Sequence, residues 1–204
     1  MTEKINFFVA LAPAAKIGGS FNWFYEILAF ISPVLLWIFD KLGIYELWGP
    51  QWQSFHTLTC SLMSEVCQTK GLRSVHIDNP SINEKGARLL NSRTMSGSSV
   101  KENIHYAQIY DSDRFARYDY GNRRNMRISY GFNFTEAPPL INMTNITTPI
   151  ALYIGLDDNI ATPSDSQWLK STIPSIVSYT ELEGFGHATF NFGKDMSYLD
   201  MISK

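Results

Sequence analysis

The chain has 204 residues, of which 45% are hydrophobic and 18% charged, so it can bury one core or a core with a cap. Its formal net charge of −2 gives no electrostatic footprint for a nucleic-acid partner. Its four histidines are too dispersed for metal-ligand spacing, and we expect neither a metal nor a cofactor.

The first apolar run extends from Ile5 to Leu11 and is stopped by Ala12-Pro13. A nearly continuous run of this length is typical of a strand that is buried on both faces of a parallel sheet. We therefore predict a strand here. The residues in front of it do not have the pattern of a signal peptide.

Residues 21–48 form the most apolar part of the chain. Glu26, Pro33 and Asp40 interrupt this segment, so it lacks the run of about 18 apolar residues that a membrane span requires. Two short helices joined at Ser32-Pro33 fit better. An ordinary helical hairpin packed on the core explains the segment, and so does a lid over an acyl-chain pocket, where excess apolar surface has a use.

A further helix is predicted from Gln51 to Gln68, and it contains the only two cysteines, Cys60 and Cys67. On one continuous helix these residues would lie about 10 Å apart, which is beyond the reach of a disulfide. A disulfide therefore requires a break between them, and the alternative is a pair of buried thiols.

Residues 100–110 recur at helical spacing after a serine cap and predict another helix. His105 lies within it and is more typical of a packed structural histidine than of a catalytic one. Residues 111–145 have no clear periodicity and predict a long connecting loop. Three glycosylation sequons occur there, at Asn133, Asn142 and Asn145, which fits a secretory protein.

The last third of the chain has the pattern strand, helix, strand. The first strand, 149–154, is followed by Asp157-Asp158, and the second, Ile176 to Leu182, is followed by Gly186-His187. A β-α-β crossover makes the two strands parallel, so both loops leave the sheet at the same edge. A carboxylate there can orient the imidazole and leave its other nitrogen free as a general base.

An aspartate–histidine pair of this kind is two thirds of a Ser-His-Asp triad. In α/β-hydrolases the serine precedes the acid in the chain, usually within G-x-S-x-G, and no such motif occurs in these residues. An aspartate in a turn and a histidine in a glycine-flanked loop also arise without any catalytic role. A missing amino-terminal part would explain the absent serine and the absent signal peptide together.

Four stretches of the chain resemble the acid lipase family, which includes the lysosomal and gastric lipases and has an α/β-hydrolase fold. The resemblance covers nearly the whole chain and corresponds to the carboxyl-terminal half of the family. The separation of 29 residues between Asp158 and His187 is also that of the family. The matching stretches are Phe8-Val-Ala-Leu-Ala-Pro13; Ser96-Gly-Ser-Ser with His105-Tyr-Ala-Gln108 and Tyr118-Asp-Tyr-Gly121; Gly155-Leu-Asp-Asp158 with Ala161 and Asp165; and Gly186-His187 with Phe190.

The resemblance implies a partial α/β-hydrolase fold in which three parallel strands with flanking helices carry a large, mostly helical cap. Residues 1–13 and 146–204 would form the core, and residues 14–145 would form the cap or lid. Asp158 would be the triad acid and His187 the general base, with Asp157 as the alternative acid. Gly186 replaces the asparagine that the family has before its histidine. The serine elbow and the oxyanion-hole loop of the family would precede Met1.

The function that follows is that of the carboxyl-terminal part of a lipase. Its substrates would be carboxylic esters of lipids, acylglycerols or sterol esters, and its cap would contact the lipid interface. The full-length parent would be a secreted or lysosomal glycoprotein, and this chain would be inactive alone because it lacks the nucleophile. The alternative is a non-catalytic lipid-binding or interaction module derived from a lipase.

Overall fold

The computed structural model describes residues 4–20, 23–47, 49, 58, 62, 82–83, 97–131 and 137–202. Cys60, Cys67 and Asn133 lie outside these residues, as does most of the helix predicted for residues 51–68. Within the described part, no helix is long and apolar enough to cross a membrane. A disulfide between Cys60 and Cys67 and a pair of buried thiols therefore both stay open, and the sequon at Asn133 stays a prediction.

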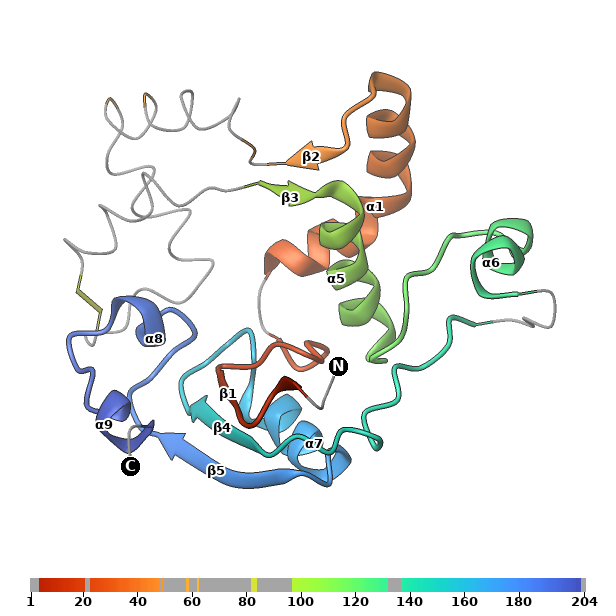
Figure 1. Cartoon of the computed structure of the whole chain (residues 1–204). Helices are drawn as coiled ribbons and strands as arrows, with labels where there is room; N and C mark the ends of the chain where they lie inside the picture. Colours follow the sequence, from red (N-terminus) through yellow and green to blue (C-terminus); the bar gives the residue numbers. More distant parts are fainter. Residues whose placement is uncertain are drawn as a thin grey trace.

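A three-stranded parallel sheet organises the chain, as the sequence predicts. The strands are β1 (Phe8–Leu11), β4 (Ile150–Gly155) and β5 (Ile176–Leu182), in the spatial order β1-β4-β5. In register, Phe8 pairs with Ile150 and Leu152 with Tyr179. Helix α7 (Pro163–Thr172) connects β4 to β5, and α8 (Thr189–Phe192) and α9 (Tyr198–Ile202) follow β5 (Figure 1).

Strand β4 is the centre of the core, because every one of its residues is buried. Alternate side chains of a strand point to opposite faces of the sheet. Leu152 and Ile154 accordingly pack with Leu169 of α7, whereas Ala151 and Tyr153 pack with residues that follow β5. The sheet is therefore covered by helices or loops on both sides, which explains why its central strand is a continuous apolar run.

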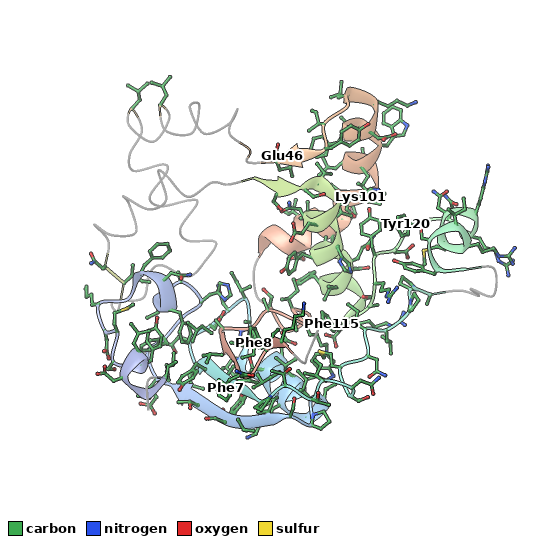
Figure 2. The ribbon with its side chains drawn as sticks, in the orientation of Figure 1. Phe7, Phe8, Glu46, Lys101, Phe115 and Tyr120 are labelled. Atoms are coloured by element: carbon green, nitrogen blue, oxygen red, sulfur yellow. The ribbon has the colours of Figure 1, made fainter. Side chains whose placement is uncertain are left out.

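Strand β1 departs from the expectation that it is buried on both faces. Phe8 is 51% exposed and Leu11 37% exposed, while Ala10 is buried. The physical reason is its position: β1 pairs with β4 on one side and is the edge of the described sheet on the other. Phe7, just before the strand, is also half exposed, so the edge is apolar as well as open (Figure 2).

Residues 23–42 form a single helix, α1 (Trp23–Leu42), and the prediction of two helices joined at Ser32-Pro33 is wrong. A proline inside a helix cannot donate to the carbonyl four residues earlier, which here belongs to Ala29. The hydroxyl of Ser32 donates to that carbonyl at 3.0 Å, so the acceptor is satisfied and the helix continues. Figure 1 shows that α1 bends part-way along, as expected of a proline. It ends in a Schellman motif in which Gly43 has φ +66° and the Ile44 amide donates to the Phe39 carbonyl.

Helix α5 (Val100–Ser112) packs against α1 through a second hydrophobic cluster that contains Leu28, Ile104 and Ala107. Its predicted serine cap is Ser99, whose side chain accepts from the Lys101 amide. A short antiparallel pair, β2 (Glu46–Leu47) and β3 (Ser98–Ser99), links the chain just after α1 to the chain just before α5. This cluster is separate from the hydrophobic cluster of the sheet, so α1 and α5 form a second packed unit. The division of the chain into a core and a cap stays a prediction.

The connecting loop predicted for residues 111–145 contains a helix, α6 (Arg123–Tyr130). Asn122 caps it, since its side chain accepts from the Asn125 amide at 2.9 Å. Met126 is its one buried residue, so the segment has too few apolar side chains to give a helical period in the sequence. Two hydrogen bonds tie it to the preceding segment, from the Tyr120 amide to the Met126 sulfur and from the Tyr130 hydroxyl to the Tyr118 carbonyl.

Candidate active site

Two loops at the carboxyl edge of the sheet bring the predicted pair together. The acid loop, residues 156–162, follows β4, and the histidine loop, residues 183–188, follows β5. The Asp158 carboxylate contacts the His187 ring, with 2.9 Å between Oδ2 and Nδ1. This is the contact expected from a parallel β-α-β unit. The catalytic role of the two residues remains a prediction.

The carboxylate of Asp158 is held by three hydrogen bonds from two directions. Its Oδ1 atom accepts from the amides of Ile160 at 2.8 Å and Ala161 at 2.9 Å, and its Oδ2 atom accepts from His187. The Asp158 side chain has no solvent exposure, whereas that of His187 is 29% exposed. The amides of the acid loop therefore fix the aspartate in one orientation, and the imidazole is partly exposed at the surface.

The Nε2 atom of His187 has no hydrogen-bond partner in the part of the chain that the structure describes. When Nδ1 donates to Asp158, the neutral imidazole carries its lone pair on Nε2. A lone pair on a partly exposed nitrogen is what a general base needs. The arrangement can therefore accept a proton from a group that approaches from the solvent side.

Asp157, the alternative acid, is not placed to replace Asp158. Its side chain is exposed, and its amide donates to the Phe185 carbonyl at 3.0 Å. Among the described contacts, only Asp158 reaches the imidazole. The sequence could not choose between two adjacent aspartates, because the choice depends on which carboxylate meets the amides of the turn.

Backbone contacts tie the acid loop to the histidine loop. The Leu156 amide donates to the Leu182 carbonyl at 3.0 Å, next to the bond between Asp157 and Phe185. Gly155 lies so close to the Phe185 carbonyl that a Cβ atom there would collide with backbone. Gly155 is therefore needed for the close approach of the two loops, and this requirement was not recognised from the sequence.

The histidine loop turns sharply and is closed by its own hydrogen bonds. Gly184 has φ +74°, a conformation that favours glycine. The Gly186 amide donates to the Thr189 hydroxyl at 2.9 Å, and Gly186 is buried. Phe185 packs on Phe190, with 5.4 Å between ring centroids. His187 thus lies between a closed turn and an aromatic cluster, which fixes its backbone.

A second buried carboxylate, Asp165, supports the acid loop from the other side. Its Oδ2 atom accepts from the Thr162 hydroxyl at 2.9 Å and from the Gly19 amide at 3.1 Å. The Ser20 hydroxyl donates to the Asn159 carbonyl at 2.9 Å. These bonds fasten the segment after β1 to the acid loop. Burial raises the pKa of Asp165 above its ordinary value of 3.8, and the hydrogen bonds from Thr162 and Gly19 oppose that rise.

The remaining candidates lie away from the pair or have local roles. His105 has its Nε2 atom 2.8 Å from the Ala116 carbonyl, a contact that fits the structural interpretation. Asn142 and Asn145 are exposed. The Ser99 hydroxyl caps α5, and no group of metal-ligating side chains occurs among the described residues.

Several known lipases are similar to the chain over nearly its whole length. Gastric triacylglycerol lipase of Bos taurus is 25% identical over 197 residues, which are 96% of this chain and 49% of that protein. Lysosomal acid lipase/cholesteryl ester hydrolase of Rattus norvegicus is 22% identical over 196 residues, with the same two shares. Lipase member K of Mus musculus is 24% identical over 198 residues, 96% of this chain and 48% of that protein.

The chain is similar to the gastric and lysosomal acid lipases. The resemblance that its sequence motifs indicate is thereby confirmed over nearly its whole length, and the acid-lipase-like chain spans about half the length of the curated relatives it matches. No protein-family model matches it. Among solved structures, an α/β hydrolase enzyme from a deep-sea metagenome library has a TM-score of 0.33 and 14% identity, covering 90% of this chain and 50% of the other.

Proposed function

We propose that this chain is the carboxyl-terminal part of a lipase that hydrolyses carboxylic esters of lipids by a Ser-His-Asp mechanism. The observation that carries the proposal is the contact between Asp158 and His187, made by a buried, fully hydrogen-bonded carboxylate and a partly exposed imidazole. The similarity to acid lipases supports the same reaction class. The nucleophilic serine would come from a segment that is not among these 204 residues.

In this mechanism His187 Nε2 takes the proton of the serine hydroxyl as the serine attacks the ester carbonyl. The resulting imidazolium is stabilised by Asp158, whose Oδ2 atom already faces Nδ1. His187 then returns the proton to the leaving alcohol. Water repeats the sequence on the acyl-enzyme, with His187 again as the base, and regenerates the serine. Donors for the oxyanion would also be supplied from outside the chain, each lowering the barrier by about 3 kcal/mol.

The substrate class proposed is acylglycerols or sterol esters, because the printed names of the relatives are triacylglycerol lipase and cholesteryl ester hydrolase. Helix α1 supports contact with such substrates. Ile27, Phe30, Val34 and Trp37 recur at helical spacing, and they are between 50% and 87% exposed. An apolar stripe of this kind suits a lid or a lipid contact. A secreted or lysosomal parent, with glycans at Asn142 and Asn145, belongs to the same proposal.

The α1 stripe also favours the second candidate, a lipid-binding module without catalysis. Joining residues 1–204 to an amino-terminal segment that contains G-x-S-x-G separates the two candidates. The catalytic proposal predicts hydrolysis of a short-chain ester that His187→Ala abolishes while the fold, measured by circular dichroism, is kept. Hydrolysis that is absent from a folded, serine-bearing protein would favour the module.

A further inference from the structure

Helix α6 carries a strongly basic face that the proposed chemistry does not use. Arg123, Arg124 and Arg127 are exposed on it, and the helix contains no acidic residue. Residues three and four positions apart on a helix lie on the same side, as Arg124 and Arg127 do, and also Arg123 and Arg127. Together with Ile128 and Gly131, the three arginines line an open hollow. Ile128 is 73% exposed, so an aliphatic side chain lies among the guanidinium groups.

The opposite face of α6 is fixed to the body of the protein. The buried Met126 accepts from the Tyr120 amide through its sulfur at 3.2 Å, and the Tyr130 hydroxyl donates to the Tyr118 carbonyl at 2.8 Å. Lys101 of α5 lies over the ring of Tyr120, 5.7 Å from its centroid, and both are seen in Figure 2. The arginine face is thereby held outward, and Figure 1 shows α6 at the margin of the molecule, away from the sheet.

The three guanidinium groups are not neutralised by the described part of the chain. None of them forms an ion pair with a described carboxylate. Asp119, the acidic residue nearest in sequence, accepts instead from the Gly121 amide at 2.7 Å. Like charges on adjacent turns repel each other, so an external anion would be favoured here. Guanidinium groups bind phosphate with two parallel hydrogen bonds.

We propose that this face of α6, Arg123, Arg124, Arg127 and Ile128, docks the protein on membranes that contain anionic phospholipid. The arginines would bind headgroup phosphates, and Ile128 would enter the boundary between headgroups and acyl chains. The inference rests on the proposed function in one respect: a lipase meets its lipid esters at a lipid surface. The position of α6 at the margin of the molecule leaves it accessible to a flat bilayer, and the exposed Ile128 suits a lipid boundary better than an acidic peptide. The net charge of −2 for the whole chain disfavours an extended nucleic-acid footprint.

The test is flotation of the full chain with vesicles of phosphatidylcholine alone and of phosphatidylcholine mixed with phosphatidylglycerol. Aggregated protein sediments in this assay and is not scored as bound. We expect binding to the mixed vesicles, little binding to neutral vesicles, and loss of binding in about 1 M salt, where charges are screened within about 3 Å. The triple variant R123Q/R124Q/R127Q should bind the mixed vesicles on the order of 100-fold more weakly.

A matched variant controls for charge alone. K4Q/K170Q/K194Q removes three exposed cations from other parts of the surface and should bind as the unmodified chain does. Ile128→Ser should weaken binding several-fold while keeping the preference for anionic lipid. Melting curves of all variants exclude unfolding as the cause, since none of the substituted side chains is buried.

Several outcomes would overturn the inference. These are equal binding to neutral and anionic vesicles, unchanged binding of the arginine variant, and displacement by millimolar inorganic phosphate, which would indicate a free-phosphate site. Stronger binding to an acidic peptide or to nucleic acid than to vesicles would do the same. Because the assay needs no ester hydrolysis, its failure would leave the proposed catalysis standing, and absent catalysis would leave this docking face standing.

Discussion

Asp158→Asn tests how the acid loop sets the state of His187. The amides of Ile160 and Ala161 both donate to Oδ1 of Asp158, so the oxygen of an asparagine must occupy that position. Its NH2 group then faces His187 Nδ1 at the place of Oδ2. An NH2 group donates, so Nδ1 must accept, and the proton of the neutral imidazole moves to Nε2. The nitrogen needed as a base is then blocked.

The expected cost follows from this change of tautomer. In a serine protease triad, the corresponding substitution lowers kcat about 10⁴-fold, equal to about 5.5 kcal/mol in activation free energy. We expect a loss of the same order in a serine-bearing protein that contains residues 1–204. The folded state should lose about 1 kcal/mol as well, because hydrogen bonds to a carboxylate are replaced by weaker ones to a neutral amide.

The tautomer can be measured by ¹⁵N NMR of the histidine ring in the serine-bearing protein that contains residues 1–204. The unmodified protein should have neutral His187 protonated at Nδ1, and Asp158→Asn should have it protonated at Nε2. Asp157→Asn is the matched control and should leave the tautomer unchanged, since that side chain is exposed. A ring that stays protonated at Nδ1 in Asp158→Asn, or hydrolysis that survives the substitution, would show that Asp158 does not set the tautomer of His187.

Three further substitutions test the supports of the site and of α1. Gly155→Ala should lower the unfolding free energy by about 1–3 kcal/mol, because the added Cβ atom would collide with the backbone of the histidine loop. The melting temperature should fall accordingly, and an unchanged melting temperature would contradict the close approach of the two loops. Asp165 binds its proton more tightly when folded, so its contribution to stability is largest below pH 3.8 and declines as pH rises through the raised pKa. Relative to Asp165→Asn, the unmodified protein should therefore gain stability in denaturant titrations as pH falls, and a gain with rising pH would reverse the assignment. Ser32→Ala should cost about 1 kcal/mol by leaving the Ala29 carbonyl unpaired, whereas Ser112→Ala, whose hydroxyl is exposed, should cost less than about 0.5 kcal/mol.

The parts of the fold that were predictable from sequence are those with strong local patterns. The apolar runs that became β4 and β5 are bounded by turn residues, and right-handed crossovers admit one arrangement of them. That rule alone placed Asp158 near His187. Ser99 could be recognised as a cap because its side chain acts within one turn of its own helix.

Features that depend on tertiary contacts were missed. Helix α6 has one buried residue and is held by contacts with Tyr118 and Tyr120. Its sequence therefore lacks the periodic apolar residues from which a helix can be predicted. Its cap, Asn122, was the one available local signal. The continuity of α1 through Pro33 depends on a single hydroxyl, that of Ser32. The exposure of β1 depends on which strands are present beside it, which the run of Phe8 to Leu11 cannot encode.

The open edge of β1 bears on how the chain behaves alone. An apolar strand with unpaired backbone groups on one side is a template for aggregation. The proposal of a longer parent predicts that another strand covers this edge. We therefore expect residues 1–204 to be poorly soluble by themselves, and a monodisperse, freely soluble chain in sedimentation velocity would count against that expectation.

In the proposed function, Asp158 and His187 would form the acid–base half of an esterase whose serine lies outside this chain. Its most direct test is hydrolysis of a short-chain ester by residues 1–204 alone and by the same residues joined to a serine-bearing amino-terminal half. We expect no turnover by the chain alone, turnover by the joined protein, and loss of that turnover in His187→Ala. Turnover by residues 1–204 alone that disappears in His187→Ala would contradict it, because a nucleophile would then be present within the chain.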